Sequence, residues 1–237
     1  MTGAALVTGS ARGIGRALVL RLAREGYDVA VHYRSSAEAA QAVAEEARSF
    51  GVAAAVVRAD VTDRAEATAL VDEAAARLGR LDVLVNNVGA YHYGPLEELE
   101  ADTWHEMLDS NLTATFHTCQ RAAPLLRDSP QGRIVNLGYA GSDALSGKPG
   151  IVAYQIAKTG VLLYSRALAK REAPHGTTVN VLAPGVMENS VTKPRGEIPM
   201  GRPGTLDEIA AALAYLVSFE ARYVTGAFLP ISGGWNV

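Results

Sequence analysis

This chain lacks the features that mark several large classes of protein. Cys119 is its only cysteine, so no internal disulfide can form and a reducing compartment is expected. No apolar run is long enough to span a membrane, and the chain does not open on a basic stretch followed by an apolar one. We therefore expect a soluble, cytoplasmic protein without a membrane partner.

An excess of charge of one sign is also missing. The chain has 22 Lys and Arg against 25 Asp and Glu, which are interspersed and give a net charge of -3. Proteins that bind nucleic acid usually carry a basic patch or stripe, so no nucleic-acid partner is expected. The five histidines are scattered without the spacing of metal ligands, so no metal site is expected either.

Apolar residues, in contrast, are abundant and regularly arranged. They make up 49% of the 237 residues, enough for a sizeable core in one domain. Short apolar runs typical of buried strands lie at 4–7, 29–33, 53–59, 83–85, 134–137, 179–182 and 228–231. Segments of helical period lie between them, at 14–26, 37–50, 64–78, 103–126, 151–171 and 206–217. This alternation predicts an α/β fold: a single-domain, doubly wound Rossmann fold over residues 1–237, with a seven-stranded parallel sheet covered by helices on both faces.

A glycine-rich turn follows the first predicted strand. Its glycines are spaced G-x-x-x-G-x-G and lie between that strand and the next helix. In this context, backbone N–H groups and the positive end of the helix can bind a pyrophosphate. The glycines have no side chain and so let the backbone approach the pyrophosphate closely. The predicted phosphate-binding residues are Gly9, Ser10, Ala11, Arg12, Gly13, Ile14 and Gly15. The alternative is a glycine-rich turn without a ligand.

A tyrosine and a lysine on one predicted helix are the second signal. Tyr154 and Lys158 are four residues apart, so they lie one above the other on the same helix face. A nearby positive charge lowers the pKa of a phenol from its ordinary value of about 10 and makes it a usable proton donor near neutral pH. Without the glycine-rich turn, a solvated helix face would be the better interpretation of this pair.

With its remaining motifs, the chain resembles the short-chain dehydrogenase/reductase family from end to end. Residues 86–89, Asn-Asn-Val-Gly, stand where the family usually shows Asn-Asn-Ala-Gly after the fourth strand. Asn111, Tyr154 and Lys158 match the other active-site positions, and 184–185, Pro-Gly, follow the sixth strand as in the family.

The resemblance implies hydride transfer between a nicotinamide and a carbonyl or alcohol carbon. Tyr154 would be the general acid in reduction. Lys158 would lower the pKa of the tyrosine and hold the hydroxyls of the nicotinamide ribose. Asn111 would position a water that links Lys158 to solvent; an asparagine that only bonds the helix backbone is the alternative.

One member of the family pattern is displaced. The family places a serine thirteen residues before the tyrosine, where this chain has Gly141. Alignment on the strand at 132–136 puts Gly138 and Tyr139 at that site and implies about two extra residues in the loop. Ser142 is the nearest hydroxyl and is predicted as the fourth catalytic residue, with Tyr139 as the other candidate and a turn residue as the alternative for both. Loss of one such donor costs about 10²–10³ in rate.

The end of the second strand predicts the cofactor. An acidic residue that would bind a ribose 2′-hydroxyl is missing there, whereas Arg34 and Ser35, with Arg12 from the glycine-rich turn, suit the 2′-phosphate of NADP. Solvated arginines are the alternative. The resemblance completes the cofactor-binding set with Tyr33, Asp60, Val61, Asn87, Val88, Gly89, Pro184, Gly185 and Val186, together with Tyr154 and Lys158.

Residues 186–205 have no convincing period and are rich in proline and glycine, including Pro194, which predicts a substrate-binding loop or lid. The plausible pocket walls are Tyr91, His92, Tyr139 and Met187.

Two resemblances compete for the substrate. Residues 201–204, Gly-Arg-Pro-Gly, and the general layout resemble 3-oxoacyl-[acyl-carrier-protein] reductases, which reduce a β-keto thioester with NADPH. Residues 31–38 and the missing serine resemble pteridine reductases. We expect a small-molecule carbonyl or acyl-thioester substrate, and a weakly active NADPH-binding sensor is the hypothesis from another class.

The family resemblance also implies a homotetramer or homodimer. The segments 103–126 and 151–171 would pack against their copies, with contributions from Leu162, Leu163 and Leu168. The last strand and residues 233–235 would make a second contact. The alternative for each of these apolar residues is an ordinary place in the core.

Overall fold

The computed structural model describes residues 3–190 and 195–236 and has a seven-stranded parallel sheet at its centre. The strands are β1 (Ala4–Val7), β2 (Asp28–Tyr33), β3 (Ala54–Arg58), β4 (Val83–Asn86), β5 (Arg133–Leu137), β6 (Thr178–Pro184) and β7 (Phe228–Ile231). Their order is β3-β2-β1-β4-β5-β6-β7, and every neighbouring pair is parallel. The predicted doubly wound fold is therefore confirmed.

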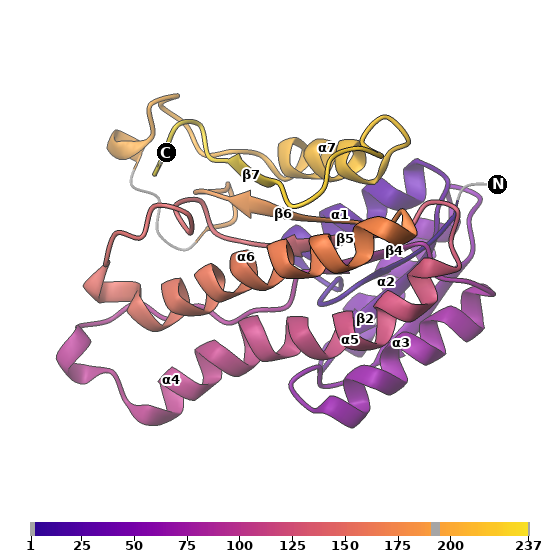
Figure 1. The fold of residues 1–237 in the computed structure, drawn as a ribbon, viewed down its shortest axis with the longest axis horizontal. Helices are drawn as coiled ribbons and strands as arrows, with labels where there is room; N and C mark the ends of the chain where they lie inside the picture. The colour runs from indigo at the N-terminus through magenta and orange to yellow at the C-terminus, as the bar shows by residue number, and fades with distance from the viewer. Residues whose placement is uncertain (1–2, 191–194, 237) are drawn as a thin grey trace.

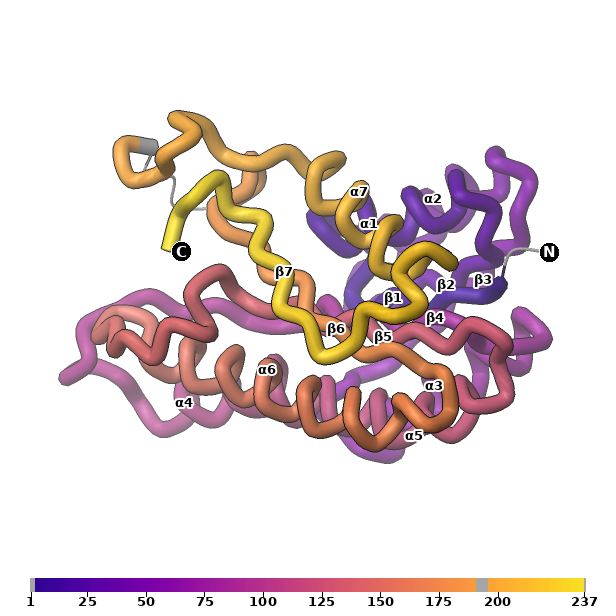
Figure 2. Tube along the Cα trace, turned by 45° about the horizontal axis from the view of Figure 1, so that its top comes forward, coloured from indigo at the N-terminus to yellow at the C-terminus, as the bar shows by residue number. Residues whose placement is uncertain are grey.

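Helices cover both faces of this sheet (Figure 1). One layer contains α1 (Gly13–Arg24), α2 (Ala37–Arg48) and α7 (Leu206–Val217), and the other contains α3 (Arg64–Leu78), α5 (Ala114–Arg127) and α6 (Val152–Glu172). The strands lie between the two layers (Figure 2). Alternate residues of β1 face opposite layers: Val7 packs in the first core and Leu6 in the second. Strands buried on both faces explain why their sequences are continuously apolar.

The strand order reverses between β1 and β4. The chain proceeds outward from β1 to β3 and then returns to place β4 on the other side of β1. Because all strands are parallel, their carboxyl ends meet at one edge of the sheet. In such sheets the crevice at the reversal point is the usual ligand site.

The predicted helix at 103–126 is wrong in one respect, because it is not a regular α-helix throughout. A π-helical segment, Asp109–Thr113, joins α4 (Ala101–Leu108) to α5. A π turn inserts an extra residue without removing the apolar face, so helical periodicity does not reveal it. This segment contains Asn111, and π segments are frequent at functional sites.

The two ends of the predicted substrate loop are tied together. Met187 forms an isolated bridge with Gly204, whose N–H donates to the Val186 carbonyl oxygen at 3.0 Å. A short 3₁₀ turn spans Arg195–Glu197. Pro194 and the rest of 191–194 lie outside the described residues. Within the part of the chain that the structure describes, no helix is long and apolar enough to cross a membrane.

Candidate active site

The glycine-rich turn forms a cradle at the carboxyl end of β1. Gly9 and Gly13 have φ values of 63° and 54°, in the left-handed region that favours glycine. A Cβ at position 15 would lie 2.3 Å from the Gly9 carbonyl oxygen, so only glycine fits there. Helix α1 begins at Gly13, and its N-cap residue Arg12 makes no side-chain cap bond. The first N–H groups of the helix are therefore available to an anion.

A buried histidine holds this turn in place. The Gly9 N–H donates to His32 Nδ1 at 2.8 Å, so His32 Nε2 carries the ring proton and donates to the Ala59 carbonyl oxygen at 3.0 Å. Burial lowers the pKa of His32, which favours this neutral form. Sequence reasoning did not assign His32 a role, although a polar residue within an apolar strand was a usable signal.

Ser10 supports the same turn from inside. Its hydroxyl donates to the Val7 carbonyl oxygen at 2.8 Å and accepts from the His32 N–H at 3.0 Å. Ser10 is fully buried and Ala11 is nearly so. The side chains of these two predicted cofactor residues therefore shape the turn. The Ser10 N–H does so as well, since it donates to the His32 carbonyl oxygen at 3.0 Å.

Asn87 joins the ends of β1 and β4. Its N–H donates to Thr8 Oγ1 at 2.9 Å, and its Nδ2 donates to the carbonyl oxygens of Thr8 and Gly9 at 3.0 and 3.2 Å. A Cβ at position 9 would lie 3.0 Å from Val88 Cγ2. Of the three predicted residues of the Asn-Asn-Val-Gly motif, Asn87 and Val88 thus lie directly against the glycine-rich turn.

A cavity of about 430 Å³ extends from this turn along the ends of β2 and β3. Arg34 lines it with a side chain that is 67% exposed, and its Nη1 lies 3.4 Å from Asp60 Oδ2. A hydrogen bond from the Thr62 hydroxyl lowers the pKa of Asp60, with a smaller contribution from Arg34. Of the predicted cofactor residues, the cavity brings together Gly9, Arg34, Asp60, Val61, Val88 and Gly89. Arg12 and Ser35 are exposed and Tyr33 is half-buried, and none of these three lines it.

Tyr154 and Lys158 lie one turn apart on α6. Lys158 Nζ is 5.8 Å from the centre of the Tyr154 ring and donates to the Leu137 carbonyl oxygen at 2.8 Å. Burial lowers the pKa of Lys158 to about 8. Burial also raises the pKa of Tyr154, and the neighbouring phenols of Tyr139 and Tyr91 raise it further. The pKa of Tyr154 is thus raised rather than lowered in the protein alone, because burial dominates it, and Tyr154 keeps its proton at neutral pH.

Asn111 places an unsatisfied oxygen beside Lys158. Its Nδ2 donates to the carbonyl oxygens of Ala90 and Met107, both at 2.9 Å, while its buried Oδ1 has no partner among the described residues. A Cβ at Gly89 would lie 2.2 Å from Asn111 Oδ1 and 3.4 Å from Lys158 Nζ. Asn111 thus bonds the helix backbone, as the alternative interpretation held, and also points a free acceptor at Gly89.

The structure separates the two candidates for the missing serine. Ser142 is buried, and its hydroxyl donates to the Tyr139 carbonyl oxygen at 2.6 Å, which is the geometry of a turn residue. The ring of Tyr139 stands edge-on to that of Tyr154, with centroids 5.6 Å apart. Both rings line a cavity of about 280 Å³, whereas Ser142 does not line it.

The last residue of β6 and the residues after it form another part of the wall of this smaller cavity. It is lined there by Pro184, Gly185, Val186 and Met187. A Cβ at Gly185 would lie 2.8 Å from Ser232 Cα, so a glycine is required where the ends of β6 and β7 approach. Three predicted pocket walls, Tyr91, Tyr139 and Met187, line this cavity, and His92 instead lines a small pocket with Gly94.

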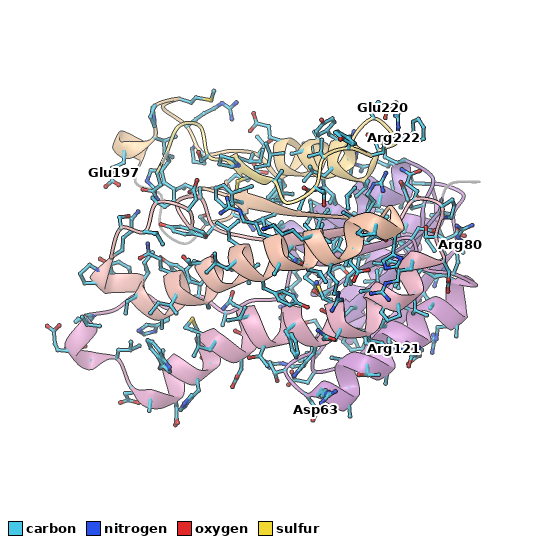
Figure 3. All side chains as sticks on the ribbon, viewed as in Figure 1. Asp63, Arg80, Arg121, Glu197, Glu220 and Arg222 are labelled. Carbon is cyan, nitrogen blue, oxygen red and sulfur yellow. The ribbon has the colours of Figure 1, made fainter. Side chains whose placement is uncertain are left out.

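A larger cavity of about 740 Å³ adjoins it and shares Tyr91, Tyr139, Val186 and Trp235. Lys148 and Glu197 also line it. Glu197 lies at the end of the molecule opposite to Arg222 (Figure 3). Sequence reasoning missed Lys148, for which no local motif gave a signal.

Comparison with known proteins shows matches along nearly the whole chain. A family model described as enoyl-(acyl carrier protein) reductase matches residues 9–236. The 3-oxoacyl-[acyl-carrier-protein] reductase FabG of Staphylococcus aureus (strain Mu50 / ATCC 700699) is 37% identical over an alignment of 243 residues, gaps included. The alignment covers 99% of this chain and 98% of the relative. The cyclohexanol dehydrogenase of Rhodococcus sp. (strain TK6) is 34% identical over 255 residues, which cover 97% of this chain and 94% of the relative. The crystal structure of a short-chain dehydrogenase from Burkholderia cenocepacia J2315 in complex with NADP has a TM-score of 0.94 and 35% identity, and the match covers 100% of this chain and 99% of that one.

Proposed function

Since this chain belongs to the short-chain dehydrogenase/reductase family, we propose that it interconverts a carbonyl and an alcohol with NADPH, on a 3-oxoacyl thioester or another small carbonyl compound. The observation that carries the proposal is the meeting of Tyr154, Lys158 and the free oxygen of Asn111 beside the glycine-rich turn. The matching family model is described as an enoyl reductase and the Staphylococcus relative as an oxoacyl reductase, so the C=O and C=C bonds need separate tests.

The residues present fit a dinucleotide with a 2′-phosphate. The turn at Gly9, Gly13 and Gly15 would hold the pyrophosphate against the N-terminus of α1. Arg34, exposed at the rim of the cavity, would pair with the 2′-phosphate in place of Asp60. When bound, NADPH supplies the hydride that is added to the carbonyl carbon.

The chain's own residues would supply the proton. Tyr154, which burial keeps protonated, would donate its phenol proton to the oxygen that becomes the alcohol as the carbonyl carbon accepts the hydride. Lys158 would stabilise the resulting phenolate and hold the ribose hydroxyls through its ammonium. Asn111 Oδ1 would accept from a water that returns a proton from solvent by way of Lys158, which satisfies an otherwise orphaned buried acceptor.

The substrate would enter through the larger cavity. Its walls include Tyr91, Tyr93 and Trp235, which suit an apolar or flat chain next to a reacting carbonyl. We also propose the segment 186–205 as the substrate-binding loop, since Val186 and Glu197 line this cavity.

We propose a homodimer or homotetramer that uses the outer face of α5 and α6. Leu163 and Phe116 expose 61% and 41% of their surface on these helices, whereas Leu162 and Leu168 are buried in the core. Of the three leucines expected at the interface, Leu163 is therefore the one free to contact a second copy. The molecular mass of wild type and Leu163→Lys, measured by light scattering, tests this contact. If the contact exists, the charged side chain should cause the variant to dissociate.

The activity is tested by NADPH oxidation in wild type and Tyr154→Phe. The compounds are an acetoacetyl thioester, small ketones, a crotonyl thioester and a dihydropterin. Tyr223→Phe is the matched control, because Tyr223 is 99% exposed. We expect turnover of the acetoacetyl thioester or a ketone that falls about 10²–10⁴-fold in Tyr154→Phe only, since loss of a general acid has this effect.

The other outcomes point elsewhere. A rate confined to the dihydropterin would favour a pteridine-type reductase, and one confined to the crotonyl thioester would favour reduction of C=C. Tight NADPH binding without any tyrosine-dependent rate would favour the sensor.

A further inference from the structure

The phenol of Tyr139, which lines both the cavity of Tyr154 and the larger adjoining cavity, is held from two sides. Lys148 Nζ lies 3.2 Å from Tyr139 Oη, and Asn236 Nδ2 lies 3.0 Å from the same oxygen. Lys148 Nζ also donates to Asn236 Oδ1 at 2.7 Å. Two residues of one loop and the distant Asn236 thus close a triangle of hydrogen bonds.

The direction of each bond in this triangle follows from the chemistry of the groups. A lysine ammonium has only donors, so the amide oxygen of Asn236 faces Lys148. The amide nitrogen then faces Tyr139 Oη, and it also lies 3.5 Å from the carbonyl oxygen of Ala140. Tyr139 Oη therefore accepts two hydrogen bonds, and donation of its own proton is the capacity that remains.

That proton has no protein acceptor within residues 3–190 and 195–236. The ring of Tyr139 is edge-on to that of Tyr154 in the cavity of about 280 Å³ that both line. Burial raises the pKa of Tyr139, so its phenol remains protonated at neutral pH. A protonated phenol whose acceptor positions are filled is a preorganised donor.

The two supporting residues are themselves anchored. The Lys148 N–H donates to Gln155 Oε1 at 3.0 Å, and Gln155 is the neighbour of Tyr154 on α6. Asn236 reaches the site because position 141 is a glycine with φ of 97°, where a Cβ would lie 3.2 Å from Asn236 Cβ. The support is therefore built on the helix that carries the proton donor and on the closely packed end of the chain.

We propose that Lys148 and Asn236 are positioning residues that direct the hydroxyl of Tyr139 to the reacting oxygen of the substrate, beside Tyr154. The inference rests on the proposed function and deepens it, because it names the second hydrogen-bond donor of the site. Tyr139 stabilises the oxygen as it gains negative charge, the role for which the hydroxyl of Ser142 is not available.

The kinetic test compares Tyr139→Phe, Lys148→Met and the double variant with wild type, using NADPH and acetoacetyl-N-acetylcysteamine. We expect kcat to fall about 10²–10³-fold in Tyr139→Phe, as for loss of an oxyanion donor. In Lys148→Met the hydroxyl remains but is less well aimed, so kcat should fall roughly tenfold. Lys148→Arg, which keeps donors, should recover part of that loss. NADPH binding by fluorescence should be unchanged throughout, which also reports intact folding.

The double variant separates positioning from direct binding. If Lys148 acts through Tyr139, then Lys148→Met causes no further loss in the Tyr139→Phe background. A full additional loss there would mean that Lys148 contacts the substrate itself, and it would overturn the positioning role. Wild-type kcat in Tyr139→Phe, matched by Tyr223→Phe, would overturn the donor role.

An infrared measurement without turnover distinguishes this inference from the proposed function. The keto carbonyl of the probe is labelled with ¹³C and bound to Tyr154→Phe with NADP⁺, where reduction cannot occur. A hydrogen bond from Tyr139 lowers the C=O stretching frequency, which should shift upward in Tyr154→Phe/Tyr139→Phe. The absence of that shift overturns the inference even if wild type oxidises NADPH. The shift in a protein without carbonyl reductase activity would overturn the proposed function alone.

Discussion

A methyl group at position 89 would test how Asn111 and Lys158 work together. Gly89→Ala would place a Cβ 2.2 Å from Asn111 Oδ1 and 3.4 Å from Lys158 Nζ. Gly89 does not have a left-handed φ, so alanine adds no backbone strain and acts by contact alone. The variant therefore perturbs the space between the two groups and alters no other side chain directly.

The size of the effect follows from how Asn111 is held. An ordinary contact is about 3.5–4.0 Å, so the amide must move by roughly 1 Å or more. It is fully buried and bonded to two carbonyl oxygens at 2.9 Å, so this movement breaks at least one bond. We expect the free energy of unfolding to fall by about 1–3 kcal/mol. The kcat should fall about 100-fold, the effect of a misplacement of this size.

The assay is NADPH oxidation in parallel with urea denaturation. Tyr223→Phe is the control, because Tyr223 is 99% exposed and lines neither of the two cavities near Tyr154. It should retain wild-type stability and rate. A Gly89→Ala variant with wild-type kcat and KM would refute the argument that the Asn111 oxygen and the Lys158 ammonium act across this gap.

Four further outcomes follow from the geometry. Arg34→Ala should raise the Kd for NADPH roughly tenfold or more and leave that for NADH unchanged, since a charge-assisted bond is worth about 1.5–3 kcal/mol; equal effects in fluorescence titrations would contradict the assignment. Ser142→Ala should lower the free energy of unfolding by about 1 kcal/mol through the lost turn bond, with a much smaller rate loss than Tyr139→Phe. Burial lowers the pKa of Lys158 to about 8, so ¹³C NMR of its Cε in the cofactor-free protein should show the ammonium being lost as pH rises through 8, and a midpoint near the ordinary 10.5 would be contrary. Burial lowers the pKa of His32 below its ordinary 6.5, so at pH values below 6.5 the unfolded chain gains a proton at this residue before the folded protein does. The contribution of neutral His32 to stability is therefore present above that pH and is lost as the pH falls. In denaturation experiments the free energy of unfolding of His32→Gln should decline less below about pH 6.5 than that of wild type.

The fold was predictable because its signals are local. Strands buried on both faces are continuously apolar, and helices with one buried face repeat with helical period. The capping box at Thr205 and Glu208 marks the start of α7 where the pattern predicts it. The π-helical segment was not predictable, since it keeps the apolar face of the helix while adding one residue to a turn.

The candidate site was predictable where its residues are neighbours in the chain. Tyr154 and Lys158 are joined by helix geometry, and the glycine-rich turn by the step from strand to helix. The pKa of Tyr154 was not predictable, because desolvation depends on which residues pack over the ring. Two of them, Tyr91 and Tyr139, come from two other loops.

The amino-acid sequence by itself determined the layered fold, the glycine-rich turn and the helix that carries the phenol and the ammonium. Only the tertiary structure showed that the Ser142 hydroxyl is bonded to the Tyr139 carbonyl oxygen, and only it placed Lys148 and Asn236 on the Tyr139 hydroxyl. The physical reason is the range of the forces involved. Backbone conformation and amphipathic periodicity act over a few residues, whereas a hydrogen bond between positions 139 and 236 depends on how the folded chain brings its distant parts together.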